Sequence, residues 1–422
     1  MNIINIYENN YYFNADYKAI FEICSKIAQK NSYKIYLIGG LVRDILLSTN
    51  ANADKIASVD NTYQSRYSMP RNDADIDISV EGDAIEFAKV LEQEVNAKIL
   101  SVHKKFGTAK VEIQEKKIDF ASTRSETYPK KGHLPHAEIG CSLEKDVLRR
   151  DFTVNSLAVS LNQDSFADLI DYVGGLEDLR SKKIRVLHKK SFIDDPTRII
   201  RGLKYSTRLG FELEEETLEL QNNYLKNINY DMGKKRIKQE IKKTFNDCGE
   251  GTFDKFIEQG IYKLITKTKI KKPKINFENL IRKYKPKHPW LVHFGTIVIN
   301  ENLEKFELTK SEKNIILDAK NLIKSTFSDD FDIYKAFCGK KTETLLILAI
   351  QGKEKQVLHY LDNLQKIKLR INGDDLIKLG FKPSKSFGEG LDYVLGEKLK
   401  NPNLKKSEEL ELFKKFYTQW AV

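Results

Sequence analysis

The stretch Asp73-Ala-Asp75-Ile-Asp77-Ile-Ser-Val80 carries two carboxylates two residues apart in a run that favours a β-strand. Alternate side chains of a strand share a face, so Asp75 and Asp77 point one way and the apolar residues point the other. Two carboxylates this close raise each other's pKa unless a cation lies between them, and Mg²⁺ suits such oxygen ligands. An isolated Asp-x-Asp is more often a solvated strand end, so the rest of the sequence must decide.

A second stretch, Ile38-Gly39-Gly40-Leu-Val-Arg43-Asp44, follows the β-favouring run from Lys34 to Ile38. The two glycines let the backbone turn sharply into a helix, which the spacing of the next apolar residues predicts. Free amides in such a turn, together with the positive end of the helix, form an anion site of the size of a phosphate. A simple tight turn is the alternative interpretation.

The residues around these stretches predict a small sheet with covering helices. We expect helices over 14–31 and 84–95, strands over 98–102, 108–113 and 117–122, and polar or irregular loops over 48–72 and 124–146. In the last strand Asp119 lies between Ile118 and Phe120 and therefore faces away from both. Asp119 is a candidate third carboxylate, and an outward aspartate on an edge strand is the alternative.

The segment Arg149-Arg150-Asp151 precedes the apolar run from Ser156 to Leu161, which we interpret as a helix. Its two guanidinium groups suit a phosphate and its carboxylate suits sugar hydroxyls. An ordinary helix start with a salt bridge would have the same sequence.

A longer helix is predicted to start at Asp194-Asp195-Pro196 and to end at Gly210. An acidic residue at the cap, proline in the first turn and glycine after the last turn are typical of helix ends. Four residues of this helix share a polar face: Arg198, Arg201, Tyr205 and Arg208. Such a face is usually only solvated.

The composition indicates a basic protein of several domains. Its 422 residues predict two to four domains, and 71 Lys+Arg against 60 Asp+Glu give a net charge of +11. The excess favours a polyanionic partner, although genomic bias toward lysine produces it too. Residues 263–287 hold ten Lys or Arg and a single acid, Glu278, which suits a nucleic-acid backbone or a flexible basic linker.

The cysteines and the apolar runs give no sign of a disulfide framework, a zinc site or a membrane span. Four cysteines are widely separated in the chain, at positions 24, 141, 248 and 338. No uninterrupted apolar segment approaches the ~18 residues that a membrane span needs, and the amino terminus does not resemble a secretion signal. We therefore expect a protein of the reducing cytoplasm.

Together, five ordered motifs resemble those of the class II tRNA nucleotidyltransferases and bacterial poly(A) polymerases. They are Gly39-Gly40-x-Val42-Arg43-Asp44, Asp75-x-Asp77, Arg149-Arg150-Asp151-Phe-Thr153-x-Asn155, Asp171-x-x-Gly174-Gly175-x-x-Asp178-Leu and Asp195-Pro-x-Arg198-x-x-Arg201. The resemblance implies an α+β fold: a nucleotidyltransferase head of the DNA polymerase beta type with a small mixed β-sheet, then an all-helical neck, body and tail. We expect the head over 1–160, the neck over 161–250 and the tRNA-binding body and tail over 251–422.

The resemblance also implies a reaction. AMP passes from ATP to the 3′-hydroxyl of tRNA, and in full CCA addition CMP passes from CTP as well, with release of pyrophosphate and with Mg²⁺ as cofactor. The implied catalytic residues are Asp75, Asp77 and Asp119, of which Asp75 and Asp77 bind the metal. The implied nucleotide-binding residues are Gly39, Gly40, Arg43, Asp44, Arg150, Asp151, Asn155, Asp195, Arg198 and Arg201.

Asp195 and Arg198, three residues apart on a helix, can read a base. Cytosine and adenine present an amino donor beside a ring-nitrogen acceptor, which a carboxylate and a guanidinium match. Uracil and guanine present the reverse and would leave buried groups unpaired. Two features depart from the family: Asp194 stands where relatives have glutamate, and the insertion between Asp44 and Asp75 is long.

The motifs leave several activities open: full CCA addition, A-only or CC-only addition, poly(A) synthesis, and RNA binding without catalysis. Ser79-Val-Glu-Gly-Asp-Ala84, Glu126-Thr-Tyr-Pro and Gly132-x-Leu-Pro135 resemble the A-adding branch. The loop before Arg149 is of full length, whereas CC-only enzymes tend to lack part of it. A-adding and full CCA-adding activity are therefore the favoured alternatives, and the oligomeric state stays open.

Overall fold

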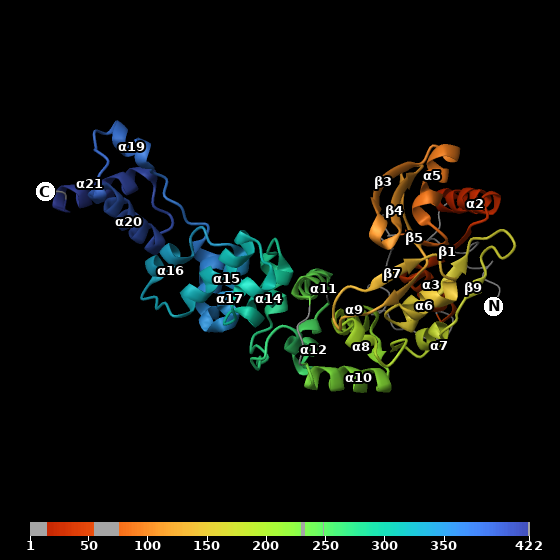
Figure 1. The fold of residues 1–422 in the computed structure, drawn as a ribbon. Coiled ribbons are helices and arrows are strands. Elements are labelled where there is room, and N and C mark those ends of the chain that lie inside the picture. The colour runs from red at the N-terminus through yellow and green to blue at the C-terminus, as the bar shows by residue number, and fades with distance from the viewer. Residues whose placement is uncertain (1–14, 55–75, 229–232, 248, 421–422) are drawn as a thin grey trace. The chain divides into compact units, whose positions relative to one another are not determined.

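The computed structural model describes residues 15–54, 76–228, 233–247 and 249–420. The chain forms two compact units, residues 1–233 and 234–422 (Figure 1). The first unit contains the sheet and the second is helical, so the predicted α+β class is confirmed.

The first unit is built on a seven-stranded sheet in the order β3-β4-β5-β2-β1-β8-β9. The sheet is mixed, because β2 and β5 are parallel and the other neighbouring strands are antiparallel. In this order the strands are Lys98–His103, Thr108–Ile113, Lys116–Ser122, Ile76–Glu81, Lys34–Ile38, Ala158–Ser160 and Leu169–Ile170.

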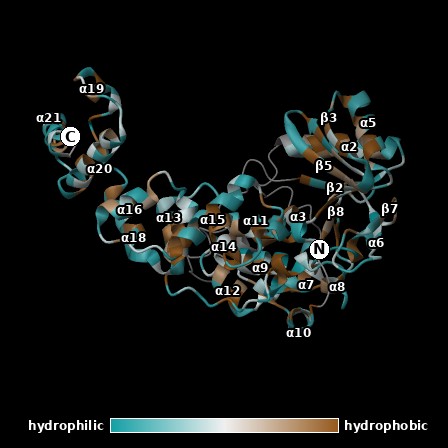
Figure 2. Ribbon diagram, turned by 60° about the vertical axis from the view of Figure 1, so that its left-hand side comes forward, coloured by the Kyte–Doolittle hydropathy of each residue, from teal (hydrophilic) through white to brown (hydrophobic). Residues whose placement is uncertain are grey.

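Helices pack on both faces of this sheet. The helices α2 (Ala15–Lys30) and α5 (Ala84–Val95) lie on one face, where Phe87 of α5 packs edge-on against Phe120 of β5 with ring centroids 5.5 Å apart. On the other face α6 (Leu143–Leu148) covers β1 and β8 through Leu143 and Val147. Figure 2 shows brown, nonpolar positions in β2, in keeping with the burial of Ile76, Ile78 and Val80.

The strand β2 has the alternation that the sequence predicts. Ile76, Ile78 and Val80 are buried against α5 and its neighbours, while Asp77 is exposed on the opposite face. The helix α3 (Gly40–Asp54) follows β1 as expected, but it continues to Asp54, into the segment predicted as a loop. The remainder of the insertion, and Asp75, lie outside the described residues.

Two other predictions for this unit are wrong. Residues 124–146 are not a long loop: they form the hairpin of β6 (Arg124–Thr127) and β7 (His136–Ile139) and the start of α6. These strands are four residues long and mostly polar, so they lack the alternation that identifies a strand. The run from Ser156 to Leu161 is the strand β8 rather than a helix, because a short apolar run fits either structure and pairing with β1 decides.

The rest of the first unit is mainly helical. It contains α7 (Gly175–Arg180), α8 (Ser191–Asp194), α9 (Thr197–Leu209) and α10 (Glu215–Lys226), together with the short parallel pair β10 (Lys183–Ile184) and β11 (Glu212–Leu213). The predicted helix is α9, which Gly210 ends in the left-handed conformation with φ +68°. Its cap differs from the prediction, because Asp194 ends α8 and Asp195 connects the two helices.

The second unit is helical, and its helix α14 (Pro289–Val298) is buried. The others are α11 (Lys234–Asp247), α12 (Thr252–Glu258), α13 (Phe277–Tyr284), α15 (Lys310–Ile323), α16 (Asp330–Phe337), α17 (Thr342–Leu348), α18 (Glu354–His359), α19 (Gly373–Lys378), α20 (Lys385–Lys400) and α21 (Lys406–Trp420). A separate small core joins α19, α20 and α21 around Phe413. Within the described part of the chain, we find no helix with the length and apolar character of a membrane span.

The predicted domain boundaries at residues 160 and 250 stay predictions. The last strand of the sheet, β9, lies beyond residue 160, and the boundary between the two compact units falls between residues 233 and 234.

Candidate active site

The exposed carboxylate of Asp77 lies beside that of a neighbouring strand. Asp77 on β2 pairs in register with Asp119 on the parallel strand β5, so both side chains leave the same face of the sheet. Asp119 also forms an ion pair with Lys110 on β4, with Nζ and Oδ2 2.9 Å apart. The geometry therefore confirms that Asp119 faces the same way as the predicted metal ligand Asp77.

These two carboxylates fit part of a divalent-cation site. Hard oxygen ligands on adjacent strands are the donors that Mg²⁺ prefers. The structure, in the ranges that it describes, has no group of three or more His, Cys, Asp or Glu residues that could hold a metal ion. The other predicted ligand, Asp75, falls outside those ranges.

The glycine turn lies directly beside the sheet face that carries Asp77. Gly39 has φ +90°, a backbone conformation that side-chain-bearing residues rarely adopt. A Cβ atom at this position would lie 3.8 Å from Nη1 of Arg150. Arg150 in turn donates from Nη2 to Oγ of Ser79, at 3.4 Å, two residues along β2 from Asp77. The structure thus brings together three sequence-predicted residues: Gly39, Arg150 and Asp77.

Arg43, which follows the turn, is buried and bound to two other predicted residues. Its Nη1 donates to Oδ1 of Asn155 at 2.5 Å, and its Nε and Nη2 donate to Oδ1 of Asp44 at 2.8 and 2.6 Å. Asp44 also pairs with Arg208 of α9, at 3.2 Å. Arg43 therefore fastens the start of α3 to the segment that carries Asn155.

Asp151 connects this segment to α9. Its Oδ1 accepts from Nδ2 of Asn155 at 3.2 Å, and its Oδ2 accepts from Nε of Arg201 at 2.7 Å. Burial by itself raises the pKa of Asp151, but the charge of Arg201 and hydrogen bonds from Arg201 and Asn155 hold that pKa below its ordinary value. Asp151 is therefore ionised in the folded protein at neutral pH.

The predicted base-reading pair, Asp195 and Arg198, lies where α8 meets α9. Arg198 is buried, and it donates from Nη1 to Oγ of Ser191 at 2.7 Å and from Nη2 to the backbone carbonyl of Arg149 at 2.6 Å. Oδ1 of Asp195 accepts from the backbone N and the Oγ1 of Thr197, at 3.1 and 2.6 Å. Both side chains are thus held in fixed orientations by the protein before any base is present.

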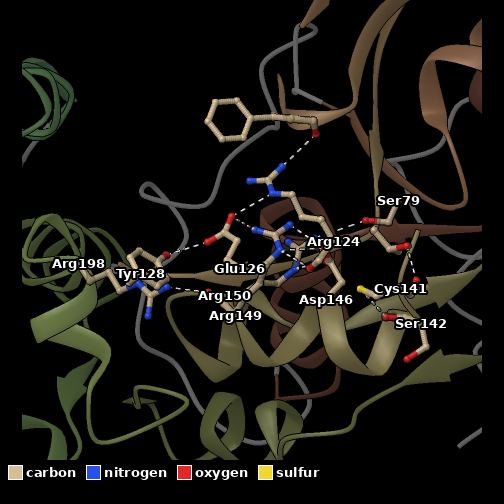
Figure 3. A network of polar contacts seen from close by, with 12 residues as sticks. Ser79, Arg124, Glu126, Tyr128, Cys141, Ser142, Asp146, Arg149, Arg150 and Arg198 are labelled. Carbon is tan, nitrogen blue, oxygen red and sulfur yellow. Dashed lines mark hydrogen bonds and ion pairs between the residues drawn. The ribbon is translucent and has the colours of Figure 1, made fainter. Parts of the chain in front are cut away.

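Two residues of the site, Asp146 and Glu126, were not predicted as site residues from the sequence. Figure 3 shows Asp146 between Arg149 and Arg150, and Glu126 between Arg124, Arg149 and Tyr128. Asp146 stands three and four residues before the two arginines, a helical spacing at which it could have been noticed. Glu126 is 23 residues from Arg149, and only the β6–β7 hairpin brings them together.

Two buried aspartates should make folding sensitive to acid. Burial raises the pKa of Asp146, but Arg150, Arg149 and the amide of Arg124 outweigh it, so its pKa, like that of Asp151, is below the ordinary value. A lowered pKa adds stability that is present above the unfolded-state pKa of about 3.9 and is lost as pH falls through the folded-state pKa.

We expect the urea midpoint of unfolding to fall steeply below about pH 4. In Asp151→Asn one group no longer takes up a proton on unfolding, so the slope of unfolding free energy against pH should decrease by up to about 1.4 kcal/mol per pH unit. Urea titrations monitored by circular dichroism between pH 3 and pH 7 measure this slope. An unchanged slope would contradict the assigned direction of the pKa.

Comparison with known proteins points in one direction. Residues 35–185 match the family model "Poly A polymerase head domain". An A-adding tRNA nucleotidyltransferase of Geobacter sulfurreducens is 31% identical over 93% of this chain, which spans 46%, about half, of that relative. An A-adding tRNA nucleotidyltransferase of Halalkalibacterium halodurans is 27% identical over 97% of this chain and 94% of its own. A solved structure of a CCA-adding enzyme, apo form II, is 26% identical, with a TM-score of 0.79 over 97% of this chain and 98% of that one.

Proposed function

Because the chain belongs to the family of class II tRNA nucleotidyltransferases and bacterial poly(A) polymerases, we propose that it transfers AMP from ATP to the 3′-hydroxyl of tRNA. One observation carries the proposal: Asp77 and Asp119 lie in register on one face of the sheet, beside Arg150 and the turn at Gly39. Carboxylates for a cation thus adjoin groups for a triphosphate. The products are pyrophosphate and an RNA that is longer by one adenylate.

Different residues of the site would bind the metal, the phosphates and the sugar. Mg²⁺ held by Asp75 and Asp77, with Asp119 beside them, would activate the hydroxyl and neutralise charge on the departing pyrophosphate. The amides after Gly39 and Gly40 and the guanidinium of Arg150 would bind the phosphates. The network of Arg43, Asp44, Asn155, Asp151 and Arg201 would hold the sugar side of the site.

Asp195 and Arg198 would select the base. A guanidinium has five N–H donors, and Arg198 uses two of them in its shortest contacts, to Ser191 and to the carbonyl of Arg149. Adenine presents the acceptor and donor that this pair can satisfy, whereas guanine and uracil do not. The site would therefore choose its nucleotide without a nucleic-acid template.

We favour terminal-A addition over full CCA addition. Two relatives that align with more than nine tenths of this chain are named A-adding enzymes. The segments Ser79–Ala84 and Glu126–Pro129 resemble the same branch. A division into head, neck, and body with tail, and a place in the cytoplasm, form part of this proposal.

Extension of defined RNAs tests the proposal. Purified protein with Mg²⁺ is given tRNA transcripts that end before CCA, after the first C, and after CC, with ATP or CTP supplied singly. We expect one adenylate on the transcript that ends in CC and none on an unrelated RNA. Addition of CMP to the shorter transcripts would change the assignment to full CCA addition, long A-tails on unrelated RNA would change it to poly(A) synthesis, and no extension would refute it.

A further inference from the structure

Asp146 is a completely buried carboxylate to which the reaction above gives no role. Its Oδ1 accepts from Nε and Nη2 of Arg149, at 3.0 and 2.7 Å, and from the backbone N of Arg124, at 3.0 Å. Its Oδ2 accepts from Nε and Nη2 of Arg150, at 3.2 and 3.0 Å. One anion thus receives five donors and holds two guanidinium groups in place (Figure 3).

Each of these two arginines leads to a different part of the site. Arg150 contacts Ser79 on β2 and lies beside Gly39, on the phosphate side. Arg149 offers its backbone carbonyl to Nη2 of Arg198, on the base side. Asp146 therefore lies at the branch point between the groups for the phosphates and the group for the base.

The side chain of Arg149 is bound by two carboxylates. Asp146 binds its Nε and Nη2, and Glu126 of the β6–β7 hairpin accepts from its Nη1 at 3.1 Å. Glu126 also accepts from Nε of Arg124 at 2.9 Å and from the hydroxyl of Tyr128 at 2.7 Å. Because the side chain is fixed on both sides, the carbonyl of the same residue presents a fixed acceptor to Arg198.

We infer that Asp146 is a positioning residue that aligns Arg150 with the nucleotide phosphates and, through Arg149, aligns Arg198 with the base. This inference rests on the proposed function. A buried ion cluster is a poor way to gain stability, since apolar residues of similar volume often serve as well or better. Asp146 is instead placed so that its loss would alter both nucleotide affinity and nucleotide choice.

Asp146→Asn keeps the shape of the side chain and removes the charge that holds both arginines. We expect the KM for ATP to rise about 10-fold or more while kcat changes less, and the preference for ATP over CTP to fall. Asp146→Glu retains the charge and should recover part of the affinity. Glu126→Gln loosens Arg149 but leaves the contacts of Asp146 with Arg150 in place, so it should weaken the preference while the KM for ATP changes less than about threefold.

Glu409→Gln is the matched control. Glu409 is also completely buried, pairs with Lys398 at 2.7 Å and accepts from the backbone N of Arg370 and Ile371, but it lies in the second unit. Glu409→Gln should lower the unfolding midpoint as Asp146→Asn does, with the KM for ATP and the nucleotide preference unchanged. If Asp146→Asn lowers only the midpoint as well, a purely structural role follows and the inference is wrong.

Equilibrium binding separates this inference from the proposed function. The affinity of the full chain for ATP with Mg²⁺, measured by calorimetry, needs no RNA extension. A loss of ATP affinity of about 10-fold in Asp146→Asn would support the positioning role. It would do so even if the wild type extends no tRNA, a result that by itself would refute the proposed function. Equal ATP affinity in the variant and the wild type would overturn the positioning role even if the wild type extends tRNA.

Discussion

Asp77→Ala is expected to lower the rate of adenylate incorporation by about 10³-fold, since metal coordination supplies several kcal/mol of transition-state stabilisation and each 1.36 kcal/mol is a factor of ten. Asp77 is exposed on β2 and leaves the sheet beside Asp119, so its loss removes a cation ligand without disturbing the packed face. Asp75 and Asp119 would remain, but Asp119 is already paired with Lys110, so we expect the variant to bind a divalent cation poorly. Folding and RNA binding should persist.

A single-nucleotide incorporation assay at saturating ATP measures this loss, and filter binding of the same RNA measures the retained affinity. Glu112→Ala is the matched control, because Glu112 lies on β4 two residues from Lys110 and on the same face of the sheet. It should incorporate adenylate at nearly the wild-type rate. Incorporation by Asp77→Ala at the rate of the Glu112 variant would rule out the metal-ligand role.

Local patterns in the sequence were enough to predict the centre of the sheet in the first unit. The alternation around Asp77 predicts which face of β2 is buried, and the Ile118–Phe120 pair predicts that Asp119 faces away from the core. The glycines after Ile38 predict the turn into α3. These features depend on neighbours within a few residues, so the chain itself contains the information.

Contacts between distant residues could not be predicted in the same way. The hairpin of β6 and β7 has no hydrophobic alternation, and β8 is a strand because it pairs with β1 and β9. Arg43 and Arg201 were predicted as nucleotide-binding residues, but their partners Asn155 and Asp151 lie 112 and 50 residues away. Their part in holding one another required the structure.

The helix face that carries Arg198 shows this limit most clearly. The spacing of Arg198, Arg201 and Arg208 predicts one polar face, whereas the structure buries Arg198, half-buries Arg201 and exposes Arg208. A guanidinium is taken out of water only at a cost, which its bonds to Ser191 and to the carbonyl of Arg149 offset. The buried member of the face is therefore the one suited to discriminate between bases.

Arg198→Ala should accordingly reduce base selectivity before it stops the reaction. We expect the ratio of kcat/KM for ATP to that for GTP to fall by roughly 10²-fold, because a site that hydrogen-bonds its substrate rejects mismatched analogues strongly. The rate with saturating ATP should fall much less, since the carboxylates of Asp77 and Asp119 are untouched. Loss of the contacts to Ser191 and Arg149 should also lower the unfolding midpoint.

Arg208→Ala is the control for this prediction, because Arg208 is an arginine on the same helix that is exposed and pairs with Asp44. Competition between ATP and GTP for one RNA end, read by the mass of the product, measures the selectivity directly. The Arg208 variant should choose ATP as the wild type does. If Arg198→Ala also keeps the wild-type choice while it loses rate, Arg198 supports the fold of the site and the base is selected by other groups.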